Sequence, residues 1–168
     1  MKTLKEAATE FLSQRRIAVA GVSATHVDAA NGIYRRMREL KYEVFAVNPN
    51  ADQVEGDRCY HSLAEIPGGV DGVVVVTHPT VAASVVADCA ALHIPRVWIH
   101  RSIGGGSLSA EAVATCERAG IGYLAGGCPM MFMEPVDGFH KCMRAVFGWT
   151  GRLPDGSGYE LPAAPATH

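Results

Sequence analysis

The stretch IAVAGVS, residues 17–23, decides the fold, because it joins a short apolar run to a glycine and a serine. A short, continuous apolar run is typical of a strand that is buried on both faces of a parallel sheet. After a polar stretch, Ile33, Met37 and Leu40 fall on one face of a helical pattern. This order of strand, loop and helix predicts the first part of a βαβ unit.

The same alternation continues along the chain. Further apolar strands are expected in residues 43–49, 71–79, 95–100 and 121–126, with helices at 80–92 and 108–120 and a weaker strand near 58–60. We therefore predict an α/β fold: a single Rossmann-like three-layer domain with a mostly parallel, doubly wound sheet of five to six strands. The domain is expected to span residues 1–150, to include an N-terminal helix at 1–14 and to be followed by a mobile tail at 151–168.

Composition excludes several classes of protein. The 168 residues are 48% hydrophobic and 19% charged, with a formal net charge of -2. This balance offers no attraction to nucleic acid, and no apolar run is long enough to cross a bilayer or to act as a signal peptide. The five cysteines form no Cys-x-x-Cys pair, which favours a reducing compartment. We expect a cytoplasmic protein, and the choice between monomer and homodimer stays open.

Parallel strands place their carboxyl ends at one rim of a sheet, where ligands bind. Gly21 would allow a tight turn and the close approach of a phosphate, and the helix that follows would present free N–H groups to it. The stretch lacks the full G-x-G-x-x-G pattern, however, so a plain turn remains an alternative. The second strand ends in Asn48, Pro49 and Asn50, with no carboxylate to hold a ribose. This disfavours a standard NAD site.

Three stretches together resemble one family. They are IAVAGVSATHVDAANGIYRRMRELKYEVFAVNPN (17–50), RCYHSLAEIPGGVDGVVVVTHP (58–79) and the run from VWIH (97–100) through GGCP (126–129). In these stretches the chain resembles the small stand-alone CoA-binding proteins, which are related to the CoA-binding domain of the succinyl-CoA ligase alpha subunit. The resemblance extends over roughly residues 10 to 145.

The resemblance implies that the chain binds coenzyme A or an acyl-CoA and makes no acyl-CoA by itself. It implies diphosphate contacts from Gly21, Val22 and Ser23, and an adenosine end bordered by Asn48, Pro49 and Asn50. The other wall would be Thr77, His78 and Pro79, and Cys128 of the Cys-Pro pair is a further candidate contact with the cofactor. Arg35, Arg36 and Arg58 are candidates for pairing with the 3′-phosphate.

The residues of the same rim also suit other functions. His78, His100 and Cys128 follow three different strands and would be able to meet as metal ligands, although a structural role for each is favoured and no metal is expected. Cys128 lies near a glycine-rich loop whose N–H groups are expected to lower its pKa, which makes it a candidate for a reactive thiol that forms a mixed disulfide with CoA. No paired carboxylates, Ser-His-Asp set or P-loop lysine is present. A non-catalytic binding module is therefore favoured over a small enzyme, whether NAD(P)-linked, metal-dependent or thiol-based.

Overall fold

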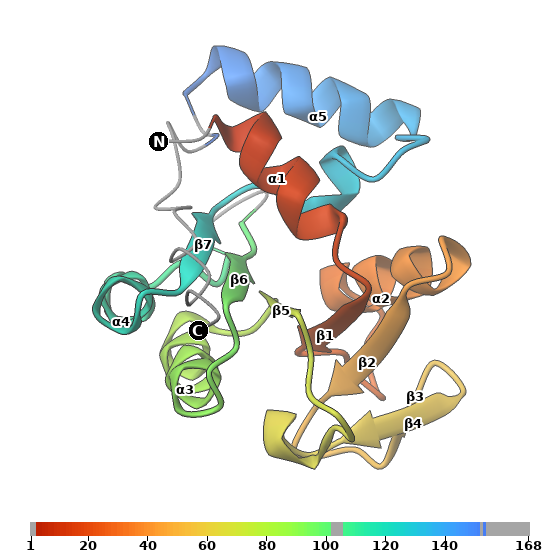
Figure 1. Ribbon diagram of the computed structural model, residues 1–168. Coiled ribbons are helices and arrows are strands. Elements are labelled where there is room, and N and C mark those ends of the chain that lie inside the picture. Colours follow the sequence, from red (N-terminus) through yellow and green to blue (C-terminus); the bar gives the residue numbers. More distant parts are fainter. Residues whose placement is uncertain (1–2, 102–105, 152, 154–168) are drawn as a thin grey trace, which may run out of the picture.

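The computed structural model describes residues 3–101, 106–151 and 153. Strands and helices alternate along most of this part of the chain (Figure 1). In chain order the elements are α1 (Leu4–Leu12), β1 (Arg16–Ala20), α2 (Ala29–Glu39), β2 (Glu43–Val47), β3 (Gln53–Val54), β4 (Asp57–Tyr60), β5 (Gly72–Val75), α3 (Pro79–Ala91), β6 (Arg96–Ile99), α4 (Ala110–Ala119), β7 (Gly122–Ala125) and α5 (Gly138–Trp149), with short 3-10 turns at Leu63–Glu65 and Pro129–Met131.

The sheet confirms the predicted fold class. Its strand order is β3-β4-β2-β1-β5-β6-β7, and every neighbouring pair except β3 and β4 is parallel. Ala20, the last residue of β1, lies opposite Val47 of β2 and Val75 of β5. After β1, the chain adds β2 on one side of β1, and later it adds β5 on the other side of β1. The switch point of this doubly wound sheet, where such folds bind ligands, therefore lies between the carboxyl ends of β1 and β5.

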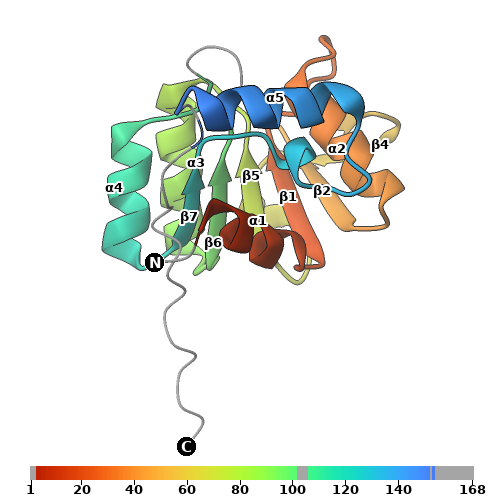
Figure 2. The ribbon, with the colours of Figure 1, turned by 90° about the horizontal axis from the view of Figure 1, so that it is seen from above.

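Helices cover both faces of the sheet. In Figure 1, α1, α2 and α5 lie on one face and α3 and α4 on the other, and Figure 2 shows α5 crossing near the carboxyl ends of the strands. The side chains divide in the same way into two buried clusters. Trp98, fully buried, centres the first cluster and packs edge-on against Phe11 of α1, with 5.5 Å between ring centroids. The N-terminal helix is thus an integral part of the core.

The sheet has one strand more than the five to six predicted. The weak candidate near 58–60 is confirmed as β4, and the strand that was missed is β3, only two residues long and antiparallel to β4. The turn between them carries positive φ at Glu55 (52°) and Gly56 (81°), as a type I′ hairpin turn requires. Asn or Asp usually precedes the glycine in such turns, so the Glu-Gly pair gave no hairpin signal.

Some expectations fall on residues that the structure does not describe. The mobile tail predicted at 151–168 lies outside the described residues except for Gly151 and Leu153, and so does most of the glycine run 103–106. Among the described helices, none combines the length and the apolar character needed to span a bilayer.

Candidate functional site

Gly21 lies where three strand ends meet. Its N–H donates to the carbonyl of Val47 (3.0 Å) and its φ is 106°, a conformation that side chains disfavour. A Cβ at this position would lie 2.1 Å from the carbonyl oxygen of Val76. The backbones after β1 and β5 approach so closely that position 21 must be glycine. This packing requirement applies whether or not a phosphate binds there.

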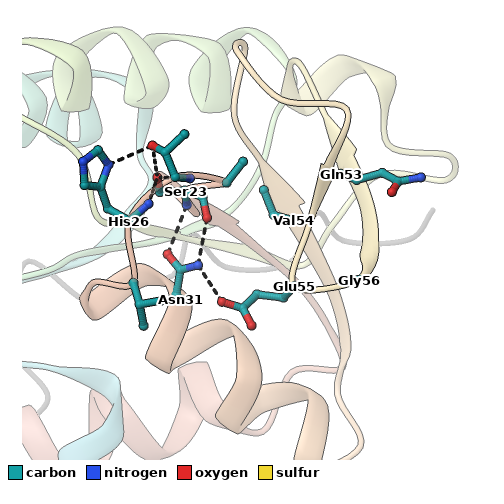
Figure 3. A pocket seen from close by; sticks show the side chains of 10 residues that line it. Ser23, His26, Asn31, Gln53, Val54, Glu55 and Gly56 are labelled. Atoms are coloured by element: carbon teal, nitrogen blue, oxygen red, sulfur yellow. Dashed lines mark hydrogen bonds between the residues drawn. The ribbon is translucent and has the colours of Figure 1, made fainter.

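The loop after Gly21 is fixed by its own hydrogen bonds (Figure 3). The hydroxyl oxygen of Ser23 accepts from the backbone N–H groups of Thr25 (3.2 Å) and His26 (3.1 Å). Buried Asn31 of α2 accepts from the Ser23 N–H (3.1 Å) and donates to the Ser23 carbonyl (2.9 Å) and to Glu55 (2.6 Å). Asn31 therefore clamps the loop to both α2 and the β3–β4 turn.

The start of α2 departs from the expected phosphate-binding pattern. Asp28 caps the helix, and its carboxylate accepts from the N–H of Ala30 at 3.0 Å. A carboxylate at this position occupies the helix N–H groups that a phosphate would use and repels an anion. The expectation that α2 presents free N–H groups to a diphosphate is therefore wrong at Ala30. A diphosphate at this helix end would have to compete with Asp28 for the Ala30 N–H.

The switch point contains a cavity of about 420 Å³, which we call the switch-point cavity. Gly21, the Asn48–Asn50 segment and Thr77, all predicted site residues, line it together. Asn48 shapes this wall: its side-chain amide donates to the Val22 carbonyl (2.9 Å) and its side-chain oxygen accepts from the Asn50 N–H (2.9 Å). The structure therefore brings the ends of β1, β2 and β5 around one hollow.

The remaining predicted residues lie around this cavity without lining it. Val22 is fully buried in the core, and Ser23 lines a separate polar cavity of about 410 Å³ on the other side of the loop. His78 caps α3, with its ring nitrogen 3.0 Å from the Thr80 hydroxyl, and Pro79 is the first residue of that helix. Both set the direction of α3.

None of the three arginines considered for the 3′-phosphate lines the switch-point cavity. Arg35 pairs with Glu55 at 3.7 Å, and Arg36 donates to the Pro135 carbonyl at 2.8 Å. The Arg58 guanidinium lies 4.8 Å from the centre of the Tyr60 ring. These contacts connect surface elements to one another.

His100 and Cys128 line a third cavity, of about 310 Å³, at the ends of β6 and β7. His78 does not line it, and among the described residues no three His, Cys, Asp or Glu side chains gather as a metal site would require. Cys128 is buried, and burial raises the pKa of its thiol to about 11. The hypothesis that a nearby loop lowers this pKa is wrong, because loss of solvation of the thiolate outweighs a hydrogen bond from the Met130 backbone.

The prediction missed part of the switch-point cavity. One further wall is formed by Val81, Ser84, Val85 and Asp88 of α3, and another by residues 61–63 after β4. The spacing of the α3 residues, i, i+3, i+4 and i+7, marks one helical face and would have identified them. Residues 61–63 lie within the C-Y-H-S-L stretch that carried the resemblance, although no contact had been assigned to them.

Comparison with known protein families shows to which family the chain belongs. A family model described as "CoA binding domain" matches residues 15–134, most of the chain and all of the strands. The chain belongs to this CoA-binding domain family. The match begins after α1 and ends before α5, so the two helices that complete one face of the sheet lie outside it.

Some similar proteins are much longer than this chain, and others are of similar length. An ADP-forming acetate–CoA ligase of Archaeoglobus fulgidus is 29% identical over 118 residues, which are 67% of this chain but 17% of the ligase. The chain thus spans about a sixth of that relative's length. A hypothetical protein from Pyrococcus horikoshii is 25% identical with a TM-score of 0.72, covering 81% of this chain and 96% of that one. A Thermus thermophilus structure has 25% identity and a TM-score of 0.69, covering 82% and 100%.

Proposed function

We propose that the protein binds coenzyme A or an acyl-CoA, with the adenosine end in the switch-point cavity and the diphosphate against the loop that begins at Gly21. One observation carries this proposal. Within the segment that matches the CoA-binding family, Gly21, Asn48–Asn50 and Thr77 surround a single cavity at the sheet's switch point. In doubly wound sheets, this is the position at which nucleotides bind.

The chemistry at the end of β2 supports CoA over NAD. NAD sites place a carboxylate there to hold the ribose hydroxyls, whereas this chain has Asn48-Pro49-Asn50, and the Asn48 side chain is used to hold the Val22 carbonyl. A carboxylate at that position would repel a ribose that carries a phosphate. Among the described residues that line the cavity, Asp88 of α3 is the one that carries a carboxylate.

The role that fits is binding without chemistry. Two thiols near the rim are buried: the pKa of Cys128 is raised to about 11, and burial also raises the pKa of Cys59, whose thiol lies 3.8 Å from the Asn48 carbonyl, so both are protonated at neutral pH. A protonated thiol is a poor nucleophile. We therefore propose a carrier, sensor or regulator of CoA.

Calorimetric titration with CoA, dephospho-CoA, NAD and ATP tests this proposal. We expect saturable binding of CoA, stronger than that of NAD, and a melting temperature that rises with CoA concentration as linkage requires. Binding of NAD without binding of CoA would overturn the proposal.

Two variants on α3 test the position of the ligand. Ser84→Leu places a large side chain in the switch-point cavity and is expected to weaken CoA binding at least about tenfold, because the added side chain takes up ligand volume. Ala87→Leu is the matched control, since Ala87 is exposed on the same helix and does not line the cavity. If both variants bind CoA like the unaltered protein, the ligand does not occupy this cavity.

A further inference from the structure

The cavity of about 310 Å³ at the ends of β6 and β7 has a composition different from that of the switch-point cavity. It lies between the start of α2, the α5 helix and the chain that follows β6 and β7. Its apolar wall is lined by Ala29, Gly32, Met130, Phe139 and Met143. We call it the His100 cavity, because His100 supplies its unpaired polar atom.

His100 is 5% exposed, and its Nε2 is a buried side-chain nitrogen without a hydrogen-bond partner among the described residues. Burial lowers the pKa of His100 to about 4, against an opposing effect of Asp28, so the ring is neutral at neutral pH. A neutral ring offers one N–H donor or one acceptor at Nε2. Buried polar atoms are nearly always paired, so an unpaired one that lines a cavity points to a ligand atom.

Two other polar side chains line the cavity, those of His140 and Cys128. His140 pairs with Asp137 through its Nδ1, at 2.6 Å, and Asp137 caps α5. The Cys128 thiol is protonated and behaves as a small apolar group. The cavity therefore presents the buried, unpaired Nε2 of His100 within a largely apolar, methionine-rich wall.

Gly32 leaves the cavity open on the α2 side. A Cβ built there would have one neighbour within 4 Å, the sulfur of Met130 at 3.7 Å. Met130 and Met143 are flexible side chains that can adapt to chains of different length. The space therefore suits an apolar group larger than a thiol.

We propose that the His100 cavity receives the acyl group of a bound acyl-CoA, and that the Nε2–H of His100 donates to the thioester carbonyl oxygen. This inference rests on the proposed function and names its substrate class: thioesters of short, uncharged acyl chains. The segment from Gly21 to Ala29 joins the two cavities, since Gly21 lines the first and Ala29 the second. A ligand that crosses this segment has its nucleotide in one cavity and its thioester in the other. An acyl chain ending in a carboxylate is disfavoured, because the wall is mostly apolar and the nearby carboxylates of Asp28, which acts on His100, and Asp137, which pairs with His140, would repel it.

Titration with CoA, acetyl-CoA, butyryl-CoA and succinyl-CoA tests the inference, with the ratio of affinities as the readout. Each methylene that enters an apolar site strengthens binding by a factor of about three to four. We expect butyryl-CoA to bind about tenfold more tightly than acetyl-CoA and more tightly than CoA, and succinyl-CoA to bind more weakly than butyryl-CoA.

Variants at the two cavities separate this inference from the proposed function. Gly32→Leu fills the His100 cavity and is expected to reduce the ratio of butyryl-CoA to CoA affinity to about one. His100→Phe keeps an aromatic side chain but removes both ring nitrogens, Nε2 included, and should lower that ratio several-fold. Ser84→Leu, in the switch-point cavity, should weaken both ligands and leave their ratio unchanged.

Each result then has one meaning. Equal affinity of the unaltered protein for CoA and butyryl-CoA would overturn the acyl cavity while the proposed function stands, and this needs no variant to fold. Preference for butyryl-CoA that survives Gly32→Leu would also overturn it. Failure of every CoA compound to bind would overturn the proposed function and the inference together.

Discussion

Two glycines with the same backbone preference have opposite surroundings. Gly21 (φ 106°) faces the Val76 carbonyl, which a Cβ would approach to 2.1 Å, whereas Gly56 (φ 81°) has nothing within 4 Å. Gly21→Ala should therefore lower the free energy of unfolding by about 3 kcal/mol or more, and Gly56→Ala by about 1 kcal/mol, the cost of a left-handed conformation alone. Urea unfolding of both variants measures the difference. Equal losses would show that the close approach to Val76 is not rigid.

Because His100 is buried, the free energy of unfolding should fall as the pH falls. The folded protein holds the pKa of His100 near 4, below the value of about 6.5 expected when unfolded. Above pH 6.5 His100 is neutral in both the folded and the unfolded protein. As the pH falls toward 4, His100 becomes protonated in the unfolded protein but stays neutral in the folded one. Between pH 7 and pH 4.5 this should cost about 2.5 kcal/mol.

His100→Phe removes this contribution. The variant should lose about 2.5 kcal/mol less than the unaltered protein between pH 7 and pH 4.5, as measured by urea unfolding at each pH. The comparison within each protein cancels the other histidines, which both share. An identical pH dependence in the two proteins would mean that folding leaves the pKa of His100 at its unfolded value.

At the level of single elements, α1 tests how far the domain extends beyond the family match. Phe11 is fully buried against Trp98, and Gly72 of β5 makes room for it, since a Cβ there would lie 2.9 Å from the Phe11 ring. Phe11→Ala should lower stability by about 3–4 kcal/mol and change the fluorescence of Trp98. Leu92→Ala, at an exposed position, should change it by less than about 0.5 kcal/mol. A small effect of Phe11→Ala would indicate that α1 is a dispensable addition.

The elements that the sequence predicted well are those whose physical signal is local. Apolar runs such as 72–76 can hardly be anything but a buried strand, and Gly120 in the left-handed conformation ends α4 where expected. The β3–β4 hairpin was missed because its stability comes from tertiary contacts. Asp57 of β4 accepts from the Tyr34 hydroxyl (2.8 Å) and pairs with Arg38, both on α2. Such contacts link positions more than 15 residues apart and have no periodicity to read.

The same distinction holds for the candidate site across the whole molecule. Which residues follow each strand is a local property, and parallel pairing gathers them, so Gly21, Asn48 and Thr77 were predictable as neighbours. The hydrogen bonds that hold these residues in place, by contrast, involve partners that are distant in the sequence. Asn31 clamps Ser23 from the first turn of α2, and the Ser107 hydroxyl oxygen, 30 residues away in the sequence, accepts from the Thr77 N–H at 2.8 Å. Loop geometry of this kind depends on packing that only the folded chain reveals.

The two ends of the parallel strands should respond differently to CoA. We call the side of the sheet where the strands begin its amino edge, and the side where they end its carboxyl edge. At the amino edge, the Arg16 N–H donates to the Asp71 carboxylate (2.8 Å) and the Asp71 N–H donates to the Arg16 carbonyl (2.8 Å), far along the strands from the switch-point cavity. At the carboxyl edge, residues 21–28, 48–50 and 77–80 would face the ligand. Hydrogen exchange with and without saturating CoA should therefore show slower exchange at the carboxyl edge, because bound ligand suppresses local opening there.

Exchange by global unfolding sets the reference for that experiment. Binding raises the free energy of unfolding by RT ln(1 + [L]/Kd), about 2.7 kcal/mol at a ligand concentration of 100 times Kd, so amides that exchange only on global unfolding slow everywhere by the same factor. Amides that exchange by local opening slow only where the opening disrupts the site. Peptides around Arg16 and Asp71 that exchange locally should then be unaffected, while those covering 21–28 and 77–80 are protected. Protection confined to the amino edge would place the ligand at the opposite end of the sheet from both cavities.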